Sequence, residues 1–102
     1  MTSSPRNSTR NRTMSTKRVK RVLRKLAEEC GELTQISMKT HEYGPESHDC
    51  GQPPKKNRRL LTEEAGDVLA LIWRLQVLGV VNQSEVHARA KEKFNKHKGQ
   101  GR

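Results

Sequence analysis

Two pairs of acidic residues at helical spacing are the feature of this sequence that could carry chemistry. The hexapeptides EECGEL and EEAGDV both follow the pattern Glu-Glu-x-Gly-acid-apolar. Residues three positions apart are neighbours on one face of a helix, so Glu29 would pair with Glu32, and Glu64 with Asp67. Four carboxylates from two packed helices would form a hard, negatively charged pocket, and oxygen ligands of this kind favour magnesium or manganese over zinc.

The second acidic pair lies in the most apolar segment of the chain. On a helix, one stripe would contain Leu60, Leu71, Leu75 and Leu78. Glu64 and Asp67 fall inside this stripe, where an uncompensated carboxylate is costly. The other side of the same helix carries Leu69, Trp73 and Val77. We therefore expect a helix enclosed on nearly all sides, with its acids held by a metal ion. The alternative for the first pair is an ordinary solvated face, paired with Arg24, Lys25 or Lys39.

Each acidic pair encloses a glycine, Gly31 or Gly66. A glycine inside a helix costs about 1 kcal/mol relative to alanine, so two at matched positions need a reason. We expect them to let the two helices approach closely where the acids converge.

Helical periodicity predicts three helices and no strand, so the fold class is all-α. The first helix is expected over about 17–41, ended by Gly44 and Pro45, and the second over about 57–78, ended by Gly79.

The third helix is expected to run from a cap at Asn82 to about Lys96, because Asn82 and Glu85 have capping-box spacing. Its face would carry Val86, Ala90 and Phe94. The apolar stripe of the first helix includes Cys30, which we expect to be a small core residue.

The remaining segments give the domain organisation. Residues 1–16 are polar and predicted to be a disordered basic arm, 17–98 form one helical domain, and 99–102 are a frayed tail. The stretch 42–56 is rich in Gly and Pro and is expected to be a long loop. With 30% hydrophobic and 3% aromatic residues, the core is thin for a lone monomer. We therefore expect association with further copies.

The net charge of +10 belongs almost entirely to the start of the chain. Residues 1–25 hold nine Lys or Arg and no acid, which leaves twelve basic residues against 11 acidic ones in the rest. Such a segment could bind nucleic acid non-specifically through phosphates, or it could simply be solvated.

Localisation is inferred from what the sequence lacks. Two cysteines make no disulfide framework, no run approaches the ~20 apolar residues of a membrane span, and no apolar signal segment follows the basic start. We expect a cytoplasmic protein without a membrane partner. A zinc site built from His41, His48, Asp49 and Cys50 is a weak rival, because these residues lack the usual paired spacing.

Taken together, the motifs resemble the MazG-type, all-α nucleoside triphosphate pyrophosphohydrolases. The family pattern E-x-x-E followed by E-x-x-D matches Glu29–Glu32 and Glu64–Asp67, and the flanks LAEECGELTQ and LLTEEAGDVLALI extend the likeness. A late Lys-Phe-x-Lys element, Lys93–Lys96, is similar to the basic third helix of the family. The resemblance covers about residues 19–97, although the spacer between the acidic pairs is longer than usual.

The resemblance implies a magnesium-dependent hydrolase, with manganese as a substitute, that cleaves (d)NTPs to the nucleoside monophosphate and pyrophosphate. The metal ligands would be Glu29, Glu32, Glu64 and Asp67. Glu28 or Glu63 would bind an additional ion or orient the attacking water, and Lys93 and Lys96 would bind phosphates. It also implies a homodimer or homotetramer in which the helical hairpin and the third helix form a four-helix-bundle-like core.

Two other functions are compatible with the residues. One is a helical nucleic-acid-binding or regulatory module that uses the basic arm, and the other is an inactive relative that only binds nucleotides. Nothing in the sequence marks the base or sugar of the nucleotide.

Overall fold

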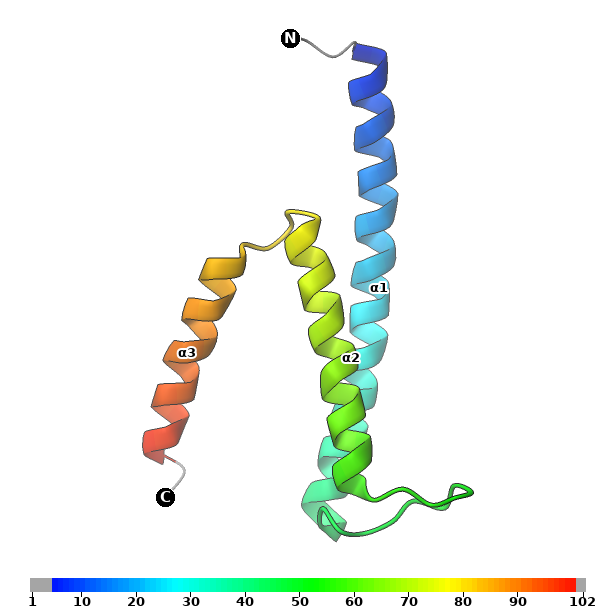
Figure 1. Ribbon diagram of the computed structural model, residues 1–102, viewed down its shortest axis with the longest axis vertical. Helices are drawn as coiled ribbons and strands as arrows, with labels where there is room; N and C mark the ends of the chain where they lie inside the picture. The colour runs from blue at the N-terminus through cyan, green and yellow to red at the C-terminus, as the bar shows by residue number, and fades with distance from the viewer. Residues whose placement is uncertain (1–4, 101–102) are drawn as a thin grey trace.

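The computed structural model describes the backbone of residues 5–100 and the side chains of residues 16–98, and it consists of three helices (Figure 1). These are α1 (Pro5–Tyr43), α2 (Asn57–Val77) and α3 (Gln83–Gln100). Over this range there is no strand, only an isolated bridge between His48 and Lys56. The all-α prediction is confirmed. None of the three helices, over the part of the chain described, is long and apolar enough to cross a bilayer.

The start of α1 differs from the prediction. The helix begins at Pro5, so residues 5–16 are helical where the sequence predicted a disordered arm, and residues 1–4 lie outside the described range. The prediction followed the scarcity of apolar residues, but a helix needs no apolar face to form locally. Proline suits the first helical turn, and no glycine or further proline interrupts residues 6–30.

The other helix ends lie close to where the turn residues predicted them. Gly44 directly follows α1, and Gly79 follows Leu78, the C-cap of α2. Their φ angles are 93° and 78°, left-handed values that glycine adopts without strain. At the start of α3, the Oδ1 atom of Asn82 accepts a hydrogen bond from the backbone N–H of Glu85 at 3.0 Å. α3 then continues to Gln100, past the predicted end near Lys96, so the predicted frayed tail is helical as far as it is described.

α1 and α2 form an antiparallel hairpin in which α2 lies against the C-terminal half of α1 (Figure 1). The α1 residues that face α2 recur at alternating intervals of three and four, the pattern of helices that pack at a shallow angle. They are Val19, Val22, Leu26, Glu29, Leu33, Ile36 and Thr40, all buried or half-buried. The matching series on α2 is Asn57, Leu61, Glu64, Val68, Leu71, Leu75 and Leu78.

This register corrects the expectation for Cys30, which is exposed. Val22 and Ile36 are fourteen residues apart, two full heptads, and both are buried. Continuing the same register places Glu29, not Cys30, at the position facing α2. Cys30 lies on the flank of the apolar stripe, so the pattern of apolar residues alone does not separate it from the core positions.

The expected enclosure of α2 is also wrong for the single chain. Leu69, Trp73 and Val77 are 45%, 57% and 84% exposed. α3 leaves the end of α2 and runs apart from the hairpin, so it does not cover this outer face (Figure 1).

The two helical glycines do not mediate contact between α1 and α2. A Cβ atom built at Gly31 or at Gly66 would meet nothing within 4 Å, apart from its own helix backbone. Both are exposed, and each is two residues from the nearest members of the facing series.

The chain exposes more surface than a compact protein of its mass. Its accessible surface is 8627 Å², whereas roughly 5,900 Å² is expected for 11.7 kDa. Its radius of gyration is 18.7 Å, against about 13 Å for a compact 100-residue domain. Among the described residues, no side chain is completely buried.

Candidate metal centre

Glu29 and Glu64 stand at core positions in the facing series of α1 and α2. Glu29 is only 8% exposed, and Glu64 is half-buried. The second acid of each pair, Glu32 or Asp67, lies three residues further along its helix and is exposed at the rim of the interface. Each helix therefore supplies one inner and one outer carboxylate to the same region.

Three of these carboxylates converge in space. One oxygen each from Glu29, Glu64 and Asp67 lies within 4.8 Å of the other two. The prediction that α1 and α2 bring acids of both pairs together is therefore reproduced by the geometry for three of the four. Asp67, expected inside the apolar stripe, is instead exposed at its edge and reaches the cluster from there.

The inner acids have oxygen atoms without partners. The Oε2 atoms of Glu29 and Glu64 are buried and accept no hydrogen bond within the described part of the chain. An orphaned buried carboxylate oxygen is costly, and one on each of two facing residues calls for a cation or a proton between the helices.

Electrostatics at the cluster lead to the same requirement. Burial first, then a hydrogen bond with Glu29 and the charges of Glu32 and Glu29, raise the pKa of Glu64 from its ordinary 4.5 to about 7. Without a cation, Glu64 is therefore about half protonated at pH 7, where an isolated glutamate would have lost its proton.

Lys25 neutralises part of the cluster from one side. Its ammonium group lies 3.5 Å from Oε1 of Glu29 and 3.7 Å from Oε1 of Glu28. The hydrogen bond with Glu29 and the charges of Glu29 and Glu28 raise the pKa of Lys25 above its ordinary value. This pairing is the solvated-face alternative foreseen for α1, but it leaves the Oε2 atom of Glu29 unsatisfied.

The donor set fits a hard divalent cation. All three converging groups are carboxylates, no sulfur or imidazole takes part, and Glu29 and Glu64 each have one buried oxygen, Oε2, without a partner. Such all-oxygen sites suit magnesium, manganese or calcium.

Glu32 extends the site into a groove beside the cluster. A groove of about 350 Å³ is lined by Glu32, Gln35, Ile36, Lys39, Leu60 and Glu64. Glu32 is outside the converging trio, yet it is near enough to Glu64 to act on its pKa through charge and a hydrogen bond. The groove is open, so a ligand of the cluster could enter along it.

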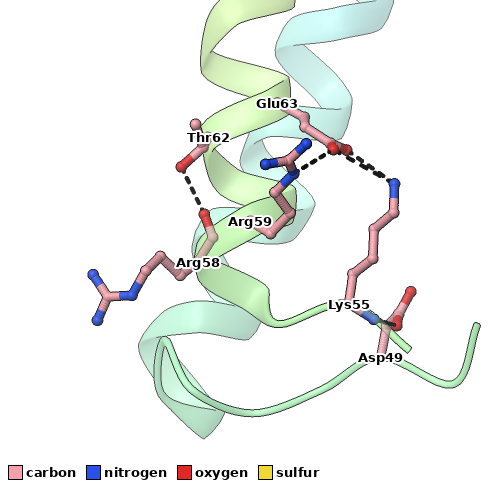
Figure 2. A network of polar contacts seen from close by, with 6 residues as sticks. All are labelled: Asp49, Lys55, Arg58, Arg59, Thr62 and Glu63. Atoms are coloured by element: carbon pink, nitrogen blue, oxygen red, sulfur yellow. Dashed lines mark hydrogen bonds and ion pairs between the residues drawn. The ribbon is translucent and has the colours of Figure 1, made fainter. Parts of the chain in front are cut away.

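The two acids assigned to an additional ion or to water orientation, Glu28 and Glu63, lie outside the converging group. Glu63 accepts a hydrogen bond from Nε of Arg59 at 2.8 Å and pairs with Lys55 at 3.4 Å (Figure 2). These two cations lower the pKa of Glu63. Glu28 is 57% exposed and pairs with Lys25.

Lys93 and Lys96, the expected phosphate ligands, are on α3, which runs apart from the hairpin (Figure 1). A single chain does not bring them to the acids. The cation that does line the groove is Lys39, which sequence reasoning considered only as an ion-pair partner. The sequence could have indicated this position, because Lys39 is seven residues after Glu32 and therefore lies on the same face of the helix.

The weak zinc alternative finds no support. Among the residues that the structure describes, the trio above is the one group of three or more potential ligands that converge, so His41, His48, Asp49 and Cys50 do not.

The comparisons with known proteins add no relative. No protein-family model matches the chain, and neither the curated proteins nor the solved structures contain a match.

Proposed function

We propose that this protein is a magnesium-dependent nucleoside triphosphate pyrophosphohydrolase of the MazG type. One observation supports it above the others: carboxylates from two antiparallel helices converge, and the two inner ones have buried oxygens without partners. These are the acids of the two motifs that resemble the family.

Glu29, Glu64 and Asp67 would hold the ion, with Glu32 as the fourth ligand from the adjoining groove. Magnesium bound there would polarise the phosphate chain, favour ionisation of the attacking water and stabilise the leaving oxygen. The water adds to the α-phosphorus while the bond to the β-phosphate oxygen breaks, which gives a nucleoside monophosphate and pyrophosphate. Lys39, at the far end of the groove, would donate to phosphate oxygens.

The working form would be a homodimer or homotetramer. Roughly 2,700 Å² of surface per chain exceeds what a compact protein of this mass exposes, and that amount matches an obligate interface. The outer face of α2, with Trp73 and Val77, would be covered by further copies. In such a bundle, α3 of a neighbouring copy could supply Lys93 and Lys96 to the acids.

The direct test is pyrophosphate release from a panel of ribo- and deoxyribonucleoside triphosphates, with magnesium or with manganese. We expect turnover of at least one nucleotide, and we expect Glu64→Gln and Asp67→Asn to abolish it while helicity stays unchanged. Glu85→Gln, on α3 outside the site, is a matched control that should keep full activity. Absence of turnover with every nucleotide and both metals would refute the proposal.

A second candidate function rests on the N-terminal part of α1. The start of α1 extends beyond the end of α2 (Figure 1). The basic residues between 17 and 24, around the first turns that pack on α2, are exposed. They are Lys17, Arg18, Lys20, Arg21 and Arg24. A projecting basic helix can bind the phosphate backbone of nucleic acid without reading its sequence.

The two functions respond differently to the same truncation. Removing residues 1–16 and replacing Lys17 and Arg18 with alanine should abolish binding if the basic helix is the active element. A pyrophosphohydrolase should keep its turnover in this variant, because the acidic cluster begins eleven residues later at Glu29.

A further inference from the structure

A second cavity lies beside the acidic groove, under the loop that connects α1 to α2. Its volume is about 520 Å³, within the usual range of small-molecule sites. It is lined by Lys39, Tyr43, Ser47, His48, Asp49, Cys50, Asn57 and Leu60. Of these residues only Leu60 belongs to the segments that resemble the family, and the loop is the part of the chain that makes the spacer long.

The loop that covers this cavity is held in place by its own hydrogen bonds. Asn57 is 4% exposed, and its Nδ2 atom donates to the carbonyl oxygen of Gly44 at 3.2 Å. The Oδ1 atom of Asp49 accepts from the backbone N–H of Lys55 at 2.6 Å, which closes the far side of the loop. The Nζ atom of Lys56 lies 3.0 Å from Oε1 of Glu46. The cavity is thus formed without a ligand.

The cavity and the acidic groove are neighbours, because Lys39 and Leu60 line both. Along α1, seven residues separate Glu32 in the groove from Lys39, a rise of about 10 Å. A nucleotide whose phosphates lay in the groove would therefore direct its sugar and base toward the loop.

The lining suits the nucleoside end of such a ligand. Tyr43 offers an aromatic ring that is 65% exposed, and Leu60 adds an apolar wall. The side chain of His48 makes no hydrogen bond or ion pair within the described part of the chain, so it is available to a base edge. Aromatic rings stack on every nucleobase, and imidazole adds a donor or an acceptor.

We propose that this cavity binds the base and sugar of the nucleotide, with Tyr43 stacked on the base and Lys39 at the junction with the phosphates. The proposal rests on the proposed function, since it assumes that the phosphates occupy the acidic groove. It assigns substrate selection to the loop at 44–56 rather than to the acidic helices.

The test compares a probe with a base to a probe without one. Calorimetry would measure the affinity of the full chain, with magnesium, for α,β-methylene triphosphates of adenosine, guanosine, cytidine and uridine, and for inorganic tripolyphosphate. We expect Tyr43→Ala to weaken the preferred nucleotide about tenfold and to leave tripolyphosphate unchanged. Tyr43→Phe, which keeps the ring, should bind the nucleotide like the wild type. Met38→Ala is a matched control, because Met38 is 60% exposed on the same helix and lines neither cavity.

Each other result overturns the proposal. Unchanged nucleotide affinity in Tyr43→Ala would show that the base does not bind in this cavity, and it would leave the proposed function intact. Equal weakening of nucleotide and tripolyphosphate would show that Tyr43 acts through the fold or the phosphates. If the wild type binds neither probe, the cavity assignment and the pyrophosphohydrolase proposal fail together.

Discussion

Glu29 and Glu64 occupy positions at which the surrounding heptad pattern would place leucine or valine. Their neighbours in the same series, Val22, Ile36 and Leu75, are the three most buried apolar residues of the described chain. Carboxylates at such positions weaken the metal-free hairpin, because two desolvated acids face each other. Their presence makes sense if a cation is bound there for function.

The first prediction follows from this cost. Glu64→Gln removes the charge and keeps the shape, so the metal-free variant should unfold at a higher temperature than the wild type above pH 7. It should also lose the stabilisation that magnesium gives the wild type. Circular dichroism melts with and without magnesium measure both effects.

Glu63→Gln is the matched control for that experiment. Glu63 is the adjacent residue but pairs with Arg59 and Lys55 on the surface, so its variant should keep the response to magnesium. A Glu64→Gln variant that unfolds at a lower temperature than the wild type at this pH would contradict the claim that the two acids destabilise the metal-free hairpin.

The second prediction concerns pH. The pKa of Glu64 is raised from 4.5 to about 7 in the metal-free fold, so the folded state binds its proton more tightly than the unfolded state. The resulting stability is fully present below pH 4.5 and is lost as pH rises through about 7. The urea concentration at the unfolding midpoint of the metal-free chain should therefore decrease as the pH is raised from about 5 to about 8.

Saturating magnesium should flatten that profile, because the cation replaces the proton in the cluster of Glu29, Glu64 and Asp67. Lys25 is charged throughout this range and does not contribute to the change. A midpoint that rises over the same interval without metal would mean that the cluster is not desolvated as described.

At the scale of elements, the helix ends next to the connecting turns were predictable, but the start of α1 and the end of α3 were not. The helix faces were predictable only in part. Gly44, Gly79 and Asn82 act locally through left-handed backbone or a cap, so the sequence alone locates these boundaries. The identity of the facing residues depends on the register between two helices. A stripe broad enough to include Cys30 could not reveal that Glu29 is the residue turned toward α2.

The glycines give an element-scale prediction. Nothing outside its own helix lies within 4 Å of a Cβ atom at Gly31 or Gly66, so alanine at either position should raise the free energy of unfolding by about 0.5–1 kcal/mol. Chemical denaturation of each single variant measures this. A loss of stability instead would show that a helix of another copy packs directly on these glycines.

At the scale of the whole molecule, the chain is a hairpin with a detached third helix rather than a closed bundle. The thin core was predictable from the composition. The exposure of the outer face of α2 could not be predicted from the sequence, because it depends on the direction in which α3 leaves the turn at Gly79. The direction of α3 also explains why Lys93 lies away from the acids of its own chain.

If the proposed oligomer forms, copies of the chain should associate through the outer face of α2 in a concentration-dependent way. Val77 is 84% exposed, so Val77→Lys should be harmless in a monomer but should shift the assembly toward smaller species. Sedimentation velocity over a dilution series measures this, and emission of the single tryptophan, Trp73, should shift to shorter wavelength as copies associate. Lys98→Ala, near the end of α3, is a control for surface substitution. A wild-type chain that stays monomeric at every concentration contradicts this assembly.

The central claim, that α1 and α2 share a divalent cation, is tested most directly by anomalous diffraction from crystals grown with manganese and an α,β-methylene nucleoside triphosphate. The account predicts an anomalous peak in direct contact with carboxylate oxygens of Glu29, Glu64 and Asp67. It would be contradicted by crystals in which these acids are paired with lysines or arginines and no peak lies between the two helices.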